Sequence, residues 1–277
     1  MSALDLDELK ACIGSSETRQ DVVDAHRLEQ FRATLGPFLV SEAVEYVPPG
    51  FHWTLFQPQT PLNELRHDGH PARLSLLPEL PFETRMWAGG EVCFHTSLKV
   101  GSALERISSV QSVDLKEGST GALLFVVIAH DYISGGSQVI SETQTIVYRD
   151  PSRSRIQKAE SIAPAEGPVF KADSRLLFRY SALTFNAHRI HYDRDYAMNE
   201  EGYPGLVVHG PLQASLLMTH LATSLGTTRY HFSYRGTSPL FDGDLASLRI
   251  DREAQTTWIE RSATDPTMKA KYTLMTA

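Results

Sequence analysis

The chain has 277 residues and a mass of 30.8 kDa, with 42% hydrophobic and 21% charged residues. This composition is typical of a folded globular protein with one large domain or two small ones, and it excludes a disordered chain. The formal net charge of -7 disfavours nonspecific binding to nucleic acid or to an anionic membrane surface.

Residues 1–35 are expected to be helical, because Leu28, Phe31 and Leu35 are three and four apart and Gly36-Pro37 ends the segment. Residues 36–85 are rich in proline and aromatic residues, and this density of proline excludes a long regular element. We expect this region to form a layer of loops over the rest of the fold.

From Gly90 to about residue 149 the hydrophobic period changes to two, with β-branched and aromatic residues, which predicts one antiparallel sheet. The sequence SGGS at 134–137 predicts the hairpin turn between its last two strands. Residues 150–173 lack hydrophobic periodicity and form the best linker candidate.

The second half is expected to contain a helix after residue 173, a polar loop, a short helix and then a long apolar helix that begins near Pro211. Strands follow, in an order similar to that of the first half. We therefore interpret the chain as a duplicated α+β unit, in which the 36–85 region replaces the helix of the first copy. The predicted divisions are 1–150 for the first unit, 151–173 for the linker and 174–277 for the second unit.

The sequence carries no segment expected to cross a membrane or to direct secretion. No run approaches the roughly 18 apolar residues of a membrane span, and the acidic start MSALDLDELKA is unlike a signal peptide. Cys12 and Cys93 are too few for a disulfide scaffold and lack the spacing of a zinc site. We expect inert, reduced thiols and a cytoplasmic location.

The densest polar cluster is NAHRIHYD at 186–193, which follows an apolar run and is therefore expected in a cleft. It contains His188 and His191, and histidine is the natural proton carrier near neutral pH. Further along, His209-Gly210-Pro211 begins the most apolar helix. The free N–H groups of a helix N-terminus can hold a carbonyl oxygen as it becomes an enolate. A base beside such donors is suited to proton transfer next to a carbonyl.

Other interpretations of the cluster stay open at this point. His188 and His191 are three apart and would suit a zinc site, but the chain has no HExxH motif and no clear carboxylate or cysteine partner. Both histidines would also fit a structural role in a polar loop. The absence of a G-x-S-x-G elbow, a P-loop and a dinucleotide fingerprint disfavours a serine nucleophile and nucleotide binding. We predict no metal.

Residues 178–214, FRYSALTFNAHRIHYDRDYAMNEEGYPGLVVHGPLQA, resemble the MaoC-like (R)-specific enoyl-thioester hydratases, specifically their double-hotdog branch. The resemblance covers nearly the whole chain and includes DGHP at 68–71, MWAGGEV at 86–92, KEG at 116–118 and IVYR at 146–149. It implies an α+β fold of two tandem hotdog units, each with an antiparallel sheet wrapped around a central helix. It also implies an acyl-CoA substrate, which brings its own CoA, and no separate cofactor.

The catalytic pattern of this family is D-x-N-P-x-H followed by H-G. The resemblance places His191 on the catalytic histidine and Gly210 on the glycine whose amide faces the thioester carbonyl. The chain departs from the pattern because Asn186 replaces the aspartate and His188 replaces the asparagine. An amide is no general base. Either Asn186 positions the water while His191 alone moves the proton, which we prefer, or Asp193 supplies the carboxylate.

Within this branch the predicted function is hydration of an α,β-unsaturated acyl-CoA, with itaconyl-CoA or mesaconyl-CoA giving citramalyl-CoA in itaconate degradation. The alternatives are a mesaconyl-C4-CoA hydratase and a general 3-hydroxyacyl-thioester dehydratase. A substrate carboxylate would favour an arginine partner. Arg189 is the candidate inside the motif, and other cations lie around it at Arg179, Arg194, Arg66, His67 and Arg85, the last three in first-half loops. Further substrate-side candidates are His188, Tyr192, Asp193, His209 and Trp87.

Two functions of another class share the fold, a hotdog thioesterase and a non-catalytic acyl-CoA binding module. The first half has no equivalent of the N-x-H-x-x-H pattern. We therefore predict one active site per chain, with the first unit as a substrate wall. A homodimer is expected only by analogy with other hotdog proteins.

Overall fold

The structure is a computed structural model that describes residues 5–36, 47–72, 75–82, 84–118, 121–150, 167–262 and 265–275. Helix α1 (Leu6–Ala11) is followed by strand β1 (Ser16–Val22) and helix α2 (Ala25–Leu35). The prediction of helix throughout residues 1–35 is therefore wrong over β1. Exposed and half-buried side chains alternate along β1, which pairs with β3 along its whole length. Pairing with the free edge of β3 has thus outweighed the weak helix propensity of residues 16–22.

Both halves of the chain contribute to one ten-stranded sheet in the order β1-β3-β4-β5-β2-β7-β10-β9-β8-β6. The first half adds β2 (Thr84–Phe94), β3 (Ala103–Gly118), β4 (Gly121–Ser134) and β5 (Ser137–Arg149). The second half adds β6 (Val169–Lys171), β7 (Tyr230–Gly236), β8 (Leu245–Asp251), β9 (Thr256–Ser262) and β10 (Asp265–Leu274). All pairs are antiparallel, and the β2–β7 pair joins the halves.

The predicted first-half sheet is confirmed, including the hairpin in which Ser134 opposes Ser137. Strand β2 begins earlier than the sequence indicates, so Arg85 lies on this strand and not in a loop. Most of the predicted linker, residues 151–166, lies outside the described residues. Its last part forms β6, which pairs with β8.

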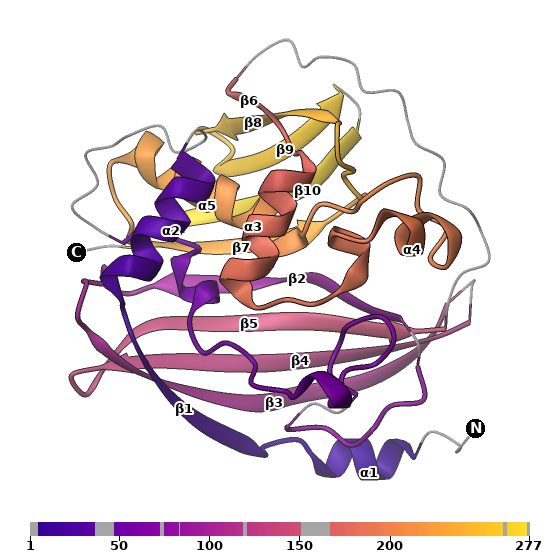
Figure 1. The fold of residues 1–277 in the computed structure, drawn as a ribbon. Coiled ribbons are helices and arrows are strands. Elements are labelled where there is room, and N and C mark those ends of the chain that lie inside the picture. Colours follow the sequence, from indigo (N-terminus) through magenta and orange to yellow (C-terminus); the bar gives the residue numbers. More distant parts are fainter. Residues whose placement is uncertain are drawn as a thin grey trace.

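The long apolar helix is confirmed as α5 (Gly210–Leu225), which follows α3 (Ser174–Thr184), the single 3-10 turn η4 (Arg189–His191) and the short α4 (Arg194–Asn199). Helix α5 is apolar on all sides, and a helix of this kind has to be enclosed. Figure 1 shows the second-half strands curving around it, with α2 and α3 on the other side. Pro211 lies in its first turn, and Gly226, with a left-handed backbone, ends it.

The first half encloses no comparable helix in the described residues. Between residues 47 and 82 the described chain contains only the 3-10 turns η2 (Phe51–Thr54) and η3 (Leu62–Glu64). Figure 1 shows this segment, in purple, crossing in front of the first-half strands. Phe51 is fully buried in a core that also contains Phe94, Leu217 and Phe232, so the two halves share one hydrophobic core.

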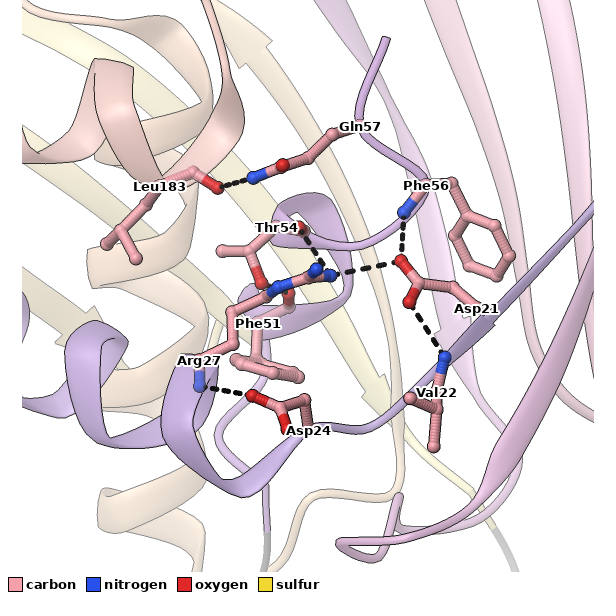
Figure 2. Close-up of polar contacts among 9 residues, drawn as sticks. All are labelled: Asp21, Val22, Asp24, Arg27, Phe51, Thr54, Phe56, Gln57 and Leu183. Atoms are coloured by element: carbon pink, nitrogen blue, oxygen red, sulfur yellow. Dashed lines mark hydrogen bonds and ion pairs between the residues drawn. The ribbon is translucent and has the colours of Figure 1, made fainter. Parts of the chain in front are cut away.

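Polar contacts fix turn η2 between the first-half sheet and α3 (Figure 2). The Asp21 carboxylate accepts hydrogen bonds from the Phe56 N–H at 2.7 Å and from the Arg27 guanidinium at 3.0 Å. The Gln57 side chain donates to the carbonyl of Leu183, the next-to-last residue of α3, at 2.6 Å. These contacts set where the chain leaves α3 and enters the polar loop of residues 186–193.

Among the described residues, no helix has the length and hydropathy needed to cross a membrane. Cys12 and Cys93 are both free thiols.

Candidate active site

The polar loop begins with a left-handed residue at the end of α3. Phe185 has a φ of 50°, a value that costs energy for a bulky residue. The Asn186 N–H then donates to the Ser181 carbonyl at 2.8 Å, and the Asn186 Oδ1 accepts the N–H of His188 at 3.0 Å. This turn leads the chain into η4 and buries His188 and His191. In this geometry the Asn186 amide shapes the loop that carries both histidines.

The protonation of His191 follows from its single backbone contact. Its Nδ1 lies 2.8 Å from the Val207 carbonyl oxygen, and a carbonyl only accepts, so Nδ1 carries the proton. The other nitrogen, Nε2, is then left with a lone pair. Burial lowers the pKa of His191 to about 4, although the bond to Val207 acts in the opposite direction. His191 is therefore a neutral imidazole at neutral pH and has a free acceptor nitrogen.

Four histidine rings form a row that runs from the first half of the chain into the second. The ring centroids of His70 and His188 are 4.0 Å apart, those of His188 and His191 are 5.3 Å apart, and those of His191 and His209 are 3.7 Å apart. Nε2 of His209 is hydrogen-bonded to the Ser181 hydroxyl at 2.9 Å. Burial lowers the pKa of all four rings, so the row is uncharged at neutral pH.

His209 is also the N-cap of α5, so the row ends at a helix N-terminus. No side chain caps this helix, and Pro211 has no N–H. The amide of Gly210 therefore belongs to the unpaired donors of the first turn, where the helix dipole is positive. A Cβ on Gly210 would lie only 2.7 Å from the Trp87 ring. Trp87 on β2 thus packs directly against the predicted oxyanion donor.

Aromatic neighbours hold Trp87 in this position. Its ring stacks on Tyr234 with centroids 4.7 Å apart and meets Trp53 edge to face at 5.5 Å. The Trp53 indole N–H is fixed by a 2.7 Å hydrogen bond to Glu142. Trp53 and Trp87, both from the first half, therefore lie beside the start of α5, and a substrate wall formed by this half stays a prediction.

The remaining loop residues are engaged with one another. Asp193 accepts the Tyr196 N–H at 3.1 Å as the N-cap of α4, and its other oxygen pairs with Arg189 at 2.7 Å. The Arg189 guanidinium also lies over the Tyr196 ring at 4.1 Å. Tyr192 is half exposed and donates to the Ala187 carbonyl at 3.1 Å. These contacts give Asp193 and Arg189 structural partners and leave neither carboxylate oxygen of Asp193 unpaired.

The structure adds two residues that the sequence analysis quoted only within the DGHP resemblance. The Asp68 carboxylate accepts from the His70 N–H at 2.9 Å and from its Nδ1 at 3.1 Å. Burial raises the pKa of Asp68, but the bonds from His70 and the charge of Arg66 outweigh it, and the net pKa is lowered. Asp68 is thus an ionised carboxylate at the start of the histidine row.

Donor atoms of Asp68, His70 and His188 all lie within 4.8 Å of one another, so these three residues are the group in the described chain that could hold a metal ion. In this structure the Asp68 oxygens are already satisfied by His70. Spacing along the sequence indicates His188 and His191 as the possible metal ligands instead. It cannot indicate Asp68 and His70, because loop 66–72 reaches His188 only in the folded chain.

Gly69 allows loop 66–72 to pack against the polar loop of residues 186–193, and its replacement by alanine should destabilise the fold. Gly69 has a φ of +89°, and a Cβ there would lie 1.8 Å from the Ala187 carbonyl oxygen. We expect Gly69→Ala to lower the free energy of unfolding, measured in urea, by at least about 3 kcal/mol. The control Gly101→Ala has a φ of +84° but open space around it. It should lose only about 1–2 kcal/mol, and equal losses would contradict the close approach.

Known structures show which class of protein this arrangement belongs to. HtdX of Mycobacterium tuberculosis superposes with a TM-score of 0.68 at 14% identity, covering 94% of this chain and 100% of that chain. A second M. tuberculosis protein, described as having a double hotdog fold, superposes with a TM-score of 0.55 at 12% identity, covering 95% and 96%. The chain therefore has the double-hotdog fold, which confirms the predicted fold class.

Sequence comparison then gives the family. Residues 50–242 match the family Hydroxyacyl-thioester dehydratase type 2. The chain is 40% identical over 265 residues to mesaconyl-C(4)-CoA hydratase of Chloroflexus aurantiacus, covering 88% of this chain and 92% of that protein. It is 27% identical over 281 residues to the mitochondrial hydroxyacyl-thioester dehydratase type 2 of Schizosaccharomyces pombe, covering 89% and 93%. The chain belongs to the hydroxyacyl-thioester dehydratase type 2 family and is a hydro-lyase acting on acyl thioesters.

Proposed function

We propose that the chain hydrates a short α,β-unsaturated acyl-CoA that carries a free carboxylate, and that mesaconyl-C4-CoA is its first candidate substrate. The relative that is 40% identical over most of both chains bears that name. Itaconyl-CoA is the second candidate. When the thioester is formed on the carboxyl group next to the saturated CH₂ carbon, this CH₂ separates the double bond from the thioester carbonyl. The double bond is then not conjugated with the thioester. An enolate mechanism then needs the conjugated isomer, mesaconyl-C4-CoA, and both routes lead to citramalyl-CoA.

The observation that carries this proposal is that the unbonded Nε2 of His191 lies close to the N-terminus of helix α5. Val207 fixes His191 as the Nδ1–H tautomer, and the His191 ring stacks on His209, the residue before Gly210. These contacts support the proposal, because they bring the proposed base close to the proposed oxyanion donor. Hydration of a conjugated thioester requires this combination.

The proposed steps need no group beyond the protein, the substrate and water. Nε2 of His191 takes a proton from water as the water oxygen forms a bond to the β-carbon. The electron pair of the double bond moves onto the α-carbon and the thioester oxygen, where the Gly210 N–H stabilises the enolate. His191 then returns the proton to the α-carbon. The reverse sequence is dehydration.

Asn186 is proposed to act through its amide group. Its Oδ1 already accepts the His188 N–H, so its NH₂ end remains to donate to the attacking water. Asp193 is the weaker candidate, because one of its oxygens caps α4 and the other pairs with Arg189.

A substrate panel tests the proposal. Purified protein is given mesaconyl-C4-CoA, itaconyl-CoA and crotonyl-CoA. Loss of the enoyl-thioester absorbance is followed for mesaconyl-C4-CoA and crotonyl-CoA, and the products of all three are quantified by mass spectrometry. We expect kcat/KM to be highest for mesaconyl-C4-CoA, with citramalyl-CoA as product. Equal kcat/KM for crotonyl-CoA would favour a general dehydratase. Release of free CoA would favour a thioesterase, and binding without turnover a binding module.

A further inference from the structure

A pocket outside the His191–Gly210 centre lies between the first-half sheet and residues 66–72 and 77–82. Its cavity volume is about 30 Å³, and it is partly open to solvent. Asp68 and His70, the start of the histidine row, form one side, and Leu77 is among its apolar residues. Arg85 and Tyr148 supply its polar groups from the sheet. The pocket is therefore continuous with the histidine row through His70.

Strand register places two hydrogen-bond donors next to each other on the sheet. Arg85 on β2 is directly opposite Tyr148 on β5, so the two side chains occupy the same face. The Tyr148 hydroxyl is buried and has no hydrogen-bond partner among the residues that the structure describes. Burial raises the pKa of Tyr148, although Arg85 and Arg66 lower it, so the hydroxyl stays protonated and can donate. A buried hydroxyl without a partner is costly unless a ligand supplies one.

The charges around these donors favour an anion. In the part of the chain that the structure describes, the Arg85 side chain has no ion pair or hydrogen bond, although its backbone belongs to the β2–β5 ladder. The one carboxylate in the pocket wall, Asp68, accepts two bonds from His70. Arg66, at the same pocket, donates to the Phe82 carbonyl at 2.9 Å. The pocket thus offers donors from Arg85 and Tyr148 with no acceptor committed to them.

The pocket is close enough to the reaction centre to receive part of the acyl group. Arg85 and Trp87 are two apart on β2, before its bulge, so they lie on one face about 7 Å apart along the strand. Trp87 contacts Gly210, which is proposed to hold the thioester oxygen. In a mesaconyl group only two carbons separate the thioester carbonyl from the free carboxylate.

We propose that Arg85 and Tyr148 bind the free carboxylate of the acyl group and so select a dicarboxylic monothioester over a simple fatty acyl thioester. This inference rests on the proposed function and deepens it. Arg85 binds the carboxylate as a charged fork, and Tyr148 donates one further hydrogen bond. Arg189, the candidate inside the sequence motif, is paired with Asp193 instead.

The test compares carboxylated and uncharged ligands in matched variants. For Arg85→Leu we expect kcat/KM with mesaconyl-C4-CoA to fall about 100-fold, whereas the value with crotonyl-CoA changes less than about twofold. Arg85→Lys should recover part of the loss, because it keeps the charge and loses the fork. Tyr148→Phe should lose about tenfold for mesaconyl-C4-CoA alone. Arg19→Leu, on the edge strand β1, is the control and should change neither value.

Binding of the two hydration products, citramalyl-CoA and 3-hydroxybutyryl-CoA, measured by calorimetry, separates this inference from the proposed function. A loss of affinity in Arg85→Leu that is confined to citramalyl-CoA supports the pocket, whatever the turnover. An equal loss for both products, or no loss for either, overturns it. Failure of the wild-type protein to hydrate mesaconyl-C4-CoA would overturn the proposed function while these binding data still decide the pocket.

Discussion

Replacement of His191 by glutamine is expected to lower kcat for hydration by about 10³–10⁴-fold, because the proton from water then has no acceptor. The structure leaves Nε2 of His191 as the available base, since Nδ1 is bound to the Val207 carbonyl. Stopped-flow measurement of enoyl-thioester absorbance with saturating substrate gives kcat directly. Affinity for citramalyl-CoA should change far less than kcat, since glutamine keeps a polar side chain of similar length.

The matched control is His26→Gln, which changes an exposed histidine on α2 whose side chain, among the described residues, has its polar contact with Gln30. It should keep the wild-type kcat. Thermal unfolding of both variants shows whether each is folded at the assay temperature. A folded His191→Gln protein that retains more than about a tenth of the wild-type kcat would exclude His191 as the base.

The same residue predicts the acidic limb of the pH profile. His191 accepts a proton only while it is neutral, and burial lowers its pKa to about 4. The value of kcat/KM should therefore stay level from pH 7 down to about pH 5 and fall as the pH passes through about 4. A fall centred near 6.5 would show that the histidine titrates as in water and that its burial is not maintained in solution.

Unfolding has to be monitored in this experiment. Burial also lowers the pKa of His52 and His130 to about 3, so these groups take up protons between pH 6.5 and 3 only when the chain unfolds. The free energy of unfolding therefore decreases as the pH falls below 6.5. Tryptophan fluorescence at each pH separates this loss of structure from the titration of the base.

Local signals in the sequence are sufficient for the elements that carry the catalytic motif. An apolar run with Pro211 in its first turn predicts α5, and its burial on all sides follows from composition alone. The local motifs also supply the candidate residues, with His188 and His191 in one polar loop and His209 directly before the start of α5. The hairpin at Ser134–Ser137 depends on glycines that accept a left-handed backbone. In each case the determinant lies within a few residues of the feature it predicts.

The features that were missed depend on partners distant in the sequence. Strand β1 forms because it pairs with the free edge of β3, and the sequence of residues 16–22 contains no signal for this distant partner. His70 reaches His188 because Gly69 lets two backbones approach closely. Arg85 and Tyr148 meet only through the register of β2 with β5. The proposed carboxylate site can therefore be recognised only in the folded structure, whereas the proposed base can be found from the sequence.

Gly210→Ala is expected to lower kcat by about 10²–10³-fold, the loss that follows removal of one oxyanion donor. A Cβ at this position would lie 2.7 Å from Cε3 of Trp87 and 3.2 Å from Cζ3. Either the indole or the first turn of α5 has to move. Trp87 is stacked on Tyr234 and meets Trp53 edge to face, so displacement of the helix amide is favoured. Single-turnover kinetics measures the chemical step without product release.

A second substitution distinguishes the loss of the amide from simple overpacking. Trp87→Leu removes the ring that the new Cβ would meet, so the double variant Gly210→Ala with Trp87→Leu should recover at least about tenfold in kcat over Gly210→Ala. Gly36→Ala adds the same methyl group at a helix end with open space and should leave kcat unchanged. If the double variant stays as slow as Gly210→Ala, the methyl group itself blocks the thioester oxygen, and Trp87 does not position the helix. If Gly210→Ala keeps the wild-type kcat, this amide does not stabilise the enolate.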